Sequence, residues 1–185
     1  MAGGDRPAGA PAKARMRELR GDRVRLRPLA EADLPRTRAW RNRDEIRRWF
    51  RTSEPIGAAQ HAAWWERHRE RDDDFVWIVE ELRGPGDPRP VGMVSLYGID
   101  EARGEAEFGR LLVGEPDAAG RGLATEATRL VAEFAQGELG LARVHLEVAA
   151  GNATAIAVYE RCGFVRESGD DAWVVMARTA TRPRS

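Results

Sequence analysis

The sequence predicts an α/β fold in which helices flank one mixed, mostly antiparallel sheet. Short apolar runs of strand length recur in both halves of the chain and are bounded by turn-forming residues. Between them stands a strand–helix–strand unit at residues 106–148, the kind of connection that lets two strands run parallel. A length of 185 residues fits a single domain built around one such sheet.

The first half of the chain is expected to supply a strand, two helical regions and a hairpin. Val24-Arg25-Leu26-Arg27 alternates apolar with basic residues, which is the pattern of a half-buried strand. The cluster Gly84-Pro85-Gly86-Asp87-Pro88 predicts a turn between two antiparallel strands. The expected elements are a strand at residues 24–27, helical stretches at 30–40 and 44–46, a helix at 58–71, and strands at 75–79 and 91–96.

The second half is expected to supply the strand–helix–strand unit and the strands that close the sheet. Residues 124–135 carry apolar side chains at helical spacing, and Gly140 is well placed to end that helix. The expected elements are a strand at residues 106–113, a loop at 114–122, helices at 124–135 and 152–161, and strands at 144–148, 164–165 and 173–176.

The two ends of the chain lack these patterns. Residues 1–20 are rich in Gly, Ala, Pro and Arg and show no apolar periodicity, so we expect a flexible N-terminal tail. Residues 181–185 have the same character and are expected to form a C-terminal tail. A single domain is therefore expected at residues 21–180.

Composition excludes several classes of function. Thirty basic residues balance thirty acidic ones, which argues against nucleic-acid binding driven by bulk charge. No apolar run approaches the roughly 18 residues that cross a bilayer. Cys162 is the single cysteine and the three histidines lie far apart, so neither a disulfide framework nor a metal site is expected. We expect a cytoplasmic protein in which Cys162 is a buried packing residue.

The loop at residues 114–122 has the features of a phosphate site. A strand runs into a turn that contains Gly120 and Gly122, and the turn opens a helix whose exposed N–H groups and positive dipole end attract anions. Small Ala124 leaves the backbone open, and Arg121 offers a charge-assisted contact. The alternative is that the glycines only shape a loop. No Gly-Lys-Ser/Thr follows, so the segment is not a nucleoside-triphosphate loop.

A second segment, residues 151–164, carries Asn152 at a helix start and Tyr159 seven residues later. Seven residues make about two helical turns, so both side chains lie on one face of the helix. Each has a plain structural interpretation, since Asn caps helices and Tyr packs in cores. If the same face meets the phosphate loop, Tyr159 is instead placed to donate a proton.

Together, the strand–loop–helix at residues 111–133 and the run from Asn152 to Phe164 resemble the GNAT N-acetyltransferase superfamily. The resemblance extends over residues 24–178 in the same element order, and it implies a splayed pair of parallel strands. The loop pattern of that superfamily is Gln/Arg-x-x-Gly-x-Gly/Ala, and Gly122 and Ala124 match its last two positions. Ala119 departs from the pattern and removes one side-chain contact to pyrophosphate, whereas the backbone amides remain.

The resemblance implies acetyl-CoA as cosubstrate, without a metal, in a V-shaped gap between residues 107–113 and 144–148. Backbone groups of Leu111, Leu112 and Val113 are expected to pair with the pantetheine arm and to polarise the thioester carbonyl. Asn152 is expected to contact the pantetheine, and Tyr159 to protonate the leaving thiolate. The pyrophosphate is expected on the backbone of Gly120, Arg121, Gly122, Leu123, Ala124 and Thr125.

Attack on the thioester also needs a base, because an alkylamine is mostly protonated at neutral pH. Glu107 lies on the strand that flanks the expected gap and is our candidate, with Glu105 as the substitute. The alternative interpretation is that Glu107 is only a charged residue on a solvated strand face.

The acceptor is expected to be a small-molecule amine bound by the first half of the chain. Trp40-Arg41-Asn42, His61 and the Ala106-Glu107-Phe108-Gly109 run resemble amino-sugar N-acetyltransferases of the pseudaminic acid pathway, in which Arg41 would pair with a diphosphate and His61 would bind sugar or phosphate. Similar patterns occur in enzymes that acetylate N-terminal alanines of ribosomal proteins and in antibiotic-modifying relatives. The size of the acyl group, a homodimer and a catalytically silent CoA-binding module stay open at this point.

Overall fold

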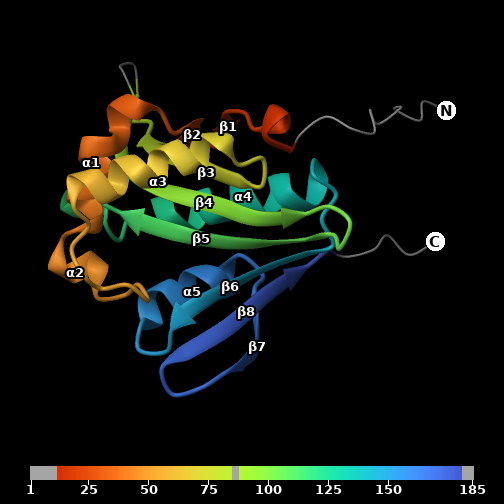
Figure 1. Ribbon diagram of the computed structural model, residues 1–185. Coiled ribbons are helices and arrows are strands. Elements are labelled where there is room, and N and C mark those ends of the chain that lie inside the picture. Colours follow the sequence, from red (N-terminus) through yellow and green to blue (C-terminus); the bar gives the residue numbers. More distant parts are fainter. Residues whose placement is uncertain (1–11, 85–87, 181–185) are drawn as a thin grey trace, which may run out of the picture.

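The computed structural model describes residues 12–84 and 88–180, which form a sheet with helices on both of its faces (Figure 1). The strands lie in the order β1-β2-β3-β4-β5-β6-β8-β7. The strands are β1 (Leu19–Arg20), β2 (Val24–Pro28), β3 (Asp74–Glu81), β4 (Arg89–Asp100), β5 (Glu105–Val113), β6 (Arg143–Ala149), β7 (Val165–Gly169) and β8 (Trp173–Thr179). The α-helices are α1 (Leu34–Arg41), α2 (Asp44–Arg47), α3 (Ala58–Glu70), α4 (Leu123–Gly137) and α5 (Ala153–Arg161).

The predicted fold class is confirmed by the way in which the strands pair. Every neighbouring pair in the sheet is antiparallel except β5 and β6, which run parallel. The parallel pair is the one that helix α4 connects, as the strand–helix–strand pattern predicts. The sheet is therefore mixed and mostly antiparallel.

Strand β3 explains why the sequence at the centre of the sheet contains a continuous apolar run. All eight of its residues are buried, because helices cover both faces. Phe75 and Trp77 belong to a core on the side of α4 and α5, whereas Val76 and Ile78 belong to a second core with residues of α1 and α3. In Figure 1, α3 crosses in front of β3 and β4, and α4 lies behind them.

The prediction of a flexible N-terminal tail is wrong for residues 12–20, which are ordered in the structure. Residues Ala12–Arg15 form a short 3-10 helix, and β1 pairs with β2 through Leu19 and Leu26. Leu19 is buried in the core, and Met16 packs against that core. A single 3-10 turn and a two-residue strand are too short to produce a readable periodicity. Residues 1–11 and 181–185, also expected to be tails, lie outside the described residues.

Other expected boundaries shift by a few residues. The helix expected at residues 30–40 begins as a 3-10 helix at Glu31–Asp33 and continues as α1, which has a proline in its first turn. The loop at residues 114–122 contains a 3-10 turn at Pro116–Ala118. The short strand expected at residues 164–165 starts at Val165 and extends to Gly169. None of the helices within residues 12–84 and 88–180 is both long and apolar enough to cross a membrane.

Candidate active site

Two cavities adjoin strand β5 and share Phe50 and Arg110 in their linings. Cavity I, of about 320 Å³, lies among α1, α3, the segment between α2 and α3, and strands β4 and β5. Cavity II, of about 240 Å³, lies between β5, β6 and α5. Because they share two lining residues, the two cavities form neighbouring compartments of one candidate site.

Cavity II brings together four residues that the sequence singles out. Glu107 and Leu111 come from β5, and Asn152 and Tyr159 come from α5. These residues are up to about fifty positions apart in the chain, and the strand–helix–strand connection folds them onto one space. Leu112 lines cavity I instead, and Val113 is not among the lining residues of either cavity.

The space for cavity II arises because β5 and β6 separate. Their parallel pairing spans three positions and ends at Glu107 and His145. Strand β5 then continues for six residues and β6 for four without pairing with each other, and Figure 1 shows them diverging. The backbone groups of β5 that face the gap are consequently open to a ligand that pairs like a strand.

A β-bulge in β5 lies beside this gap. Between two paired positions, β4 advances from Met93 to Ser95 while β5 advances by one residue more, from Leu112 to Gly109. Within this stretch Arg110 has a φ of 50°, and it is the one non-glycine residue with positive φ among those described. The bulge changes the direction of the backbone N–H groups where the two cavities meet.

Arg110 is held in place by contacts with two neighbouring strands. Its Nη1 donates a 2.6 Å hydrogen bond to Oδ1 of buried Asp74, and its guanidinium lies 4.4 Å from the ring centre of Tyr97. Burial alone would raise the pKa of Asp74, but the neighbouring His68 and the hydrogen-bonded Arg110 outweigh it and lower that pKa to about 2. Asp74 therefore stays ionised and keeps the arginine beside the bulge.

Glu107 is not a freely solvated strand residue. Its side chain is half-buried in the lining of cavity II, and its Oε1 accepts a 2.6 Å hydrogen bond from the hydroxyl of Tyr97. Burial, together with this hydrogen bond to a carboxylate, raises the pKa of Tyr97, so that the phenol remains a donor. The contact occupies one carboxylate oxygen of Glu107.

Tyr159 is buried to 7% exposure, with its ring edge-on to Phe108 at 5.8 Å between ring centres. Burial raises the pKa of this phenol. The hydroxyl therefore stays protonated at neutral pH and can act as a proton donor in cavity II. Cys162 follows in the same segment as a buried thiol, and its Sγ donates to the carbonyl of Thr125.

Asn152 has the structural role that an Asn at a helix start suggests. It caps α5, and its Oδ1 accepts a 3.1 Å hydrogen bond from the N–H of Ala155. The capping contact uses only the carbonyl oxygen. The side-chain amide N–H₂ group therefore remains as a donor on a residue that lines cavity II.

The glycine loop leads into α4 as the sequence predicts. Gly120 and Gly122 have φ values of 71° and 77°, and Gly122 is the N-cap of α4. No side chain caps this end, so the N–H groups of the first turn, at Leu123, Ala124 and Thr125, are left for an anion. This loop is not among the lining residues of cavities I and II.

The side chain of Arg121 is already engaged. Its guanidinium forms a 2.5 Å ion pair with buried Glu81. A second arginine, Arg23, lies next to the glycine turn. Arg23 donates to the carbonyl of Arg121 at 2.8 Å, and its Nη2 would lie 2.9 Å from a side chain at Gly122. Arg23 lies about a hundred residues before the loop and in no motif, so nothing local in the sequence marks it.

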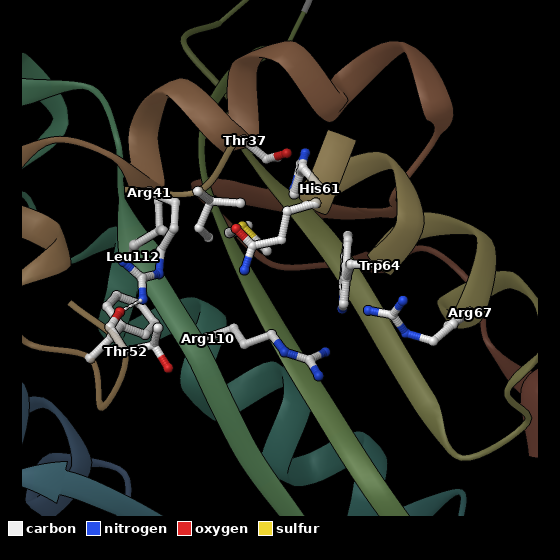
Figure 2. A pocket seen from close by; sticks show the side chains of 12 residues that line it. Thr37, Arg41, Thr52, His61, Trp64, Arg67, Arg110 and Leu112 are labelled. Atoms are coloured by element: carbon white, nitrogen blue, oxygen red, sulfur yellow. Dashed lines mark hydrogen bonds between the residues drawn. The ribbon is translucent and has the colours of Figure 1, made fainter. Parts of the chain in front are cut away.

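Cavity I contains the guanidinium of Arg41, to which the described residues offer no carboxylate partner. The Arg41 guanidinium stacks 3.8 Å from the ring centre of Phe50, and its Nη2 donates to the carbonyl of Thr52 at 2.6 Å (Figure 2). Its Nη1 is buried and has no hydrogen-bond partner among the described residues. Burial lowers the pKa of this group, yet a guanidinium remains charged. A half-buried charge of this kind calls for an anionic ligand.

The rest of the cavity I lining is basic or uncharged. His61, Trp64 and Arg67 come from α3 and Arg110 from β5, and no Asp or Glu of the described chain is among the lining residues (Figure 2). The imidazole of His61 stacks on Trp64 at 5.3 Å between ring centres. Burial, and then the charge of Arg38, lower the pKa of His61, so this ring is neutral at pH 7 and can only hydrogen-bond.

Besides Arg23, the structure adds three residues that could not be identified from the sequence. Tyr97, Asp74 and Arg110 belong to three neighbouring strands and meet around Glu107 and the bulge. Their partners become known only with the strand register, and the bulge alters that register. Within the described chain, no group of three or more His, Cys, Asp and Glu side chains is arranged to hold a metal ion.

Comparison with protein families gives one match that covers most of the chain. The family described as the acetyltransferase (GNAT) domain matches residues 23–165. This range runs from β2 to the start of β7 and includes every lining residue of cavity I and all those of cavity II except Trp173.

Curated relatives and solved structures agree with this match. The spermidine N(1)-acetyltransferase of Escherichia coli K12 is 30% identical over 143 residues, which cover 76% of this chain and 72% of that protein. A spermidine N-acetyltransferase from Vibrio cholerae, solved with CoA and spermine, is 23% identical with a TM-score of 0.74, covering 84% of this chain and 95% of that one. FdhC, solved without ligand and described as a nucleotide-linked sugar GNAT, is 23% identical with a TM-score of 0.73, covering 88% and 89% of the two chains.

Proposed function

Since the chain belongs to the GNAT acetyltransferase family and is therefore an acyltransferase, we propose that it transfers an acetyl group from acetyl-CoA to the primary amine of a small, phosphate-bearing acceptor, best a nucleotide-linked amino sugar. The observation that carries the choice of acceptor is the half-buried guanidinium of Arg41 in cavity I, which has no ion-pair partner among the described residues.

The donor half of this proposal rests on the open backbone of β5 and α4. The unpaired edge of β5 beyond Glu107 offers strand-like hydrogen bonds to a pantetheine arm. The uncapped first turn of α4 after Gly122 offers N–H groups to a pyrophosphate. Both features fit an extended ligand that ends in a phosphate group, and Asn152 adds a side-chain amide donor in cavity II.

The catalytic residues then follow from their places in cavity II. Glu107 accepts the proton that the acceptor ammonium releases, and the neutral nitrogen forms a bond to the thioester carbonyl carbon. Backbone N–H groups at the bulge donate to the carbonyl oxygen, where negative charge develops. Tyr159 gives its proton to the sulfur as the carbon–sulfur bond breaks. The nitrogen loses a second proton as the amide forms, and this proton returns to the phenolate through solvent.

The charge of cavity I supports a phosphate-bearing acceptor over a polyamine. A polyamine is a polycation, and in this cavity it would meet Arg41, Arg67 and Arg110 without a lining carboxylate. A diphosphate supplies the anion that the Nη1 of Arg41 lacks, in the paired geometry that guanidinium groups favour. Neutral His61 is then available to hydrogen-bond a sugar hydroxyl or a phosphate oxygen.

The experiment measures release of the CoA thiol from acetyl-CoA in the presence of four acceptor sets. These are nucleotide-linked 4-amino sugars, spermidine, peptides with free N-terminal Ala or Ser, and aminoglycosides. Turnover confined to the amino sugars is the expected result. Turnover of spermidine or peptides alone would overturn the acceptor assignment and leave acetyl transfer intact. If acetyl-CoA binds and no set is turned over, the protein does not act on these amines and the proposal fails.

A further inference from the structure

Tyr97 lies in the lining of cavity II and takes no direct part in the proposed reaction. Tyr97 on β4 pairs directly with Glu107 on β5, so the two side chains lie on the same face of the sheet. Its hydroxyl donates a 2.6 Å hydrogen bond to Oε1 of Glu107. Among the described residues, no donor reaches the second oxygen, Oε2, which stays available to a ligand in the cavity.

The phenol of Tyr97 is itself held from two sides. Gly109 leaves room for it, because a Cβ at that position would lie only 2.8 Å from the Tyr97 hydroxyl. The guanidinium of Arg110 lies 4.4 Å from the ring centre and is tied to buried Asp74 by a 2.6 Å hydrogen bond. The bulge, the ion pair and the glycine together determine where the hydroxyl lies.

We propose that Tyr97 is a positioning residue that holds the carboxylate of Glu107 in one orientation, with Oε2 directed to the acceptor amine. The proposal rests on the proposed function, in which Glu107 is the base. A glutamate side chain otherwise has several rotamers, and a single strong hydrogen bond removes much of that freedom. Tyr97 touches no reacting atom, so its whole effect on catalysis passes through Glu107.

Four variants test this dependence: Tyr97→Phe, Glu107→Gln, the double variant, and Ser95→Ala as the control. Ser95 precedes Tyr97 by two positions on the same strand face, and its buried hydroxyl has no hydrogen-bond partner in the described chain. Each variant is assayed for kcat and KM with acetyl-CoA and the nucleotide-linked 4-amino sugar.

We expect Glu107→Gln to lower kcat by about a hundredfold and Tyr97→Phe by about tenfold, with both KM values within about twofold of the original. The double variant is expected to match Glu107→Gln alone, since the phenol has no other route to the reaction. Ser95→Ala is expected to keep the original kcat. A double variant slower than Glu107→Gln by the full factor of Tyr97→Phe would overturn the proposal, as would a Tyr97→Phe variant with unchanged kcat.

A crystal structure of Tyr97→Phe judges the positioning role without any acceptor. The carboxylate of Glu107 is expected to occupy more than one rotamer, and an unchanged single orientation would overturn the proposal. If the original protein turns over no amine, the proposed function fails by itself, and this structure still decides whether Tyr97 positions Glu107. If Glu107→Gln retains full activity, Glu107 is not the base and the inference falls with that assignment alone.

Discussion

The indole N–H of Trp40 donates a 2.9 Å hydrogen bond to Oε1 of Glu115, and this contact joins helix α1 to the start of the glycine loop. Gly114 packs so closely on the same indole that a Cβ there would lie 2.1 Å from the ring. Arg43 adds a hydrogen bond to the carbonyl of Gly114. Because Arg41 is the next residue of α1, the lining of cavity I and the beginning of the loop form one packed unit.

Because of this packing, we expect a change at Trp40 to weaken acetyl-CoA binding at the glycine loop. Trp40→Phe keeps an aromatic ring against Gly114 and removes the N–H that Glu115 accepts. The variant loses a hydrogen bond to a carboxylate at the start of the glycine loop, so we expect weaker acetyl-CoA binding, by about threefold to tenfold, in isothermal titration calorimetry. The control is Trp77→Phe, which loses an indole hydrogen bond to the carbonyl of Arg17 elsewhere in the fold. That variant is expected to unfold at a lower temperature and to bind acetyl-CoA normally.

The guanidinium of Arg41 is expected to determine acceptor affinity. Arg41→Met keeps an apolar side chain against Phe50 and removes the charge from cavity I. Loss of a charge-assisted phosphate contact should raise the acceptor KM by about tenfold to a hundredfold, with an unchanged KM for acetyl-CoA. Steady-state kinetics with the nucleotide-linked sugar check this. Arg36→Met removes an exposed charge from the same helix, and equal effects of the two changes would contradict the role of Arg41.

The hydroxyl of Tyr159 is expected to matter for the rate and not for binding. Tyr159→Phe leaves the ring packed on Phe108 and removes the buried proton donor. We expect kcat to fall by about a hundredfold or more, as for loss of a general acid, while calorimetry gives an unchanged affinity for acetyl-CoA. A variant with the original kcat would show that the thiolate takes its proton from another group.

Asp74 is expected to make the free energy of unfolding depend on pH. Its pKa is lowered to about 2 because the neighbouring His68 and the hydrogen-bonded Arg110 outweigh the effect of burial. An Asp whose folded pKa lies below its unfolded value of about 3.9 adds stability at higher pH and loses it as the pH falls towards 2. Between about pH 6 and pH 3, the original protein should therefore lose about 1 kcal/mol more unfolding free energy than Asp74→Asn.

Urea unfolding at the two pH values measures this difference. Asp72→Asn removes an exposed carboxylate two positions earlier that forms no ion pair within the described residues. This control should lose as much stability on acidification as the original protein. If Asp74→Asn behaves like Asp72→Asn, the ion pair with Arg110 does not lower the pKa of Asp74.

Much of the candidate site could be predicted because its signals are local. Asn152 and Tyr159 lie seven positions apart on one helix, and helical periodicity alone places them on the same face. Gly120 and Gly122 adopt positive φ values before α4, as a glycine turn at a helix start suggests. The parallel strands follow from the helix between them, since a short turn cannot connect strands that run the same way.

The parts that could not be predicted depend on partners distant in the chain. Tyr97 meets Glu107 through the pairing of β4 and β5, and bulges on either side of that position alter the register. The chain contains many arginines, and nothing local distinguishes Arg41 from Arg27, which is paired with Asp33. The expected tail failed for the same reason, because Leu19 is identified as a core residue only by its pairing with Leu26.

By itself, the sequence determined the mixed α/β order, the glycine turn before α4, and the helix that carries Asn152 and Tyr159, because periodicity and backbone freedom act over a few neighbouring residues. Only the tertiary structure decided that Glu107 accepts a hydrogen bond from Tyr97, that Arg121 is paired with Glu81, and that one buried nitrogen of Arg41 has no partner among the described residues. The physical reason is that a charge or a hydrogen-bonding group acquires its role from what surrounds it, and strand register and helix packing set those surroundings across the whole chain.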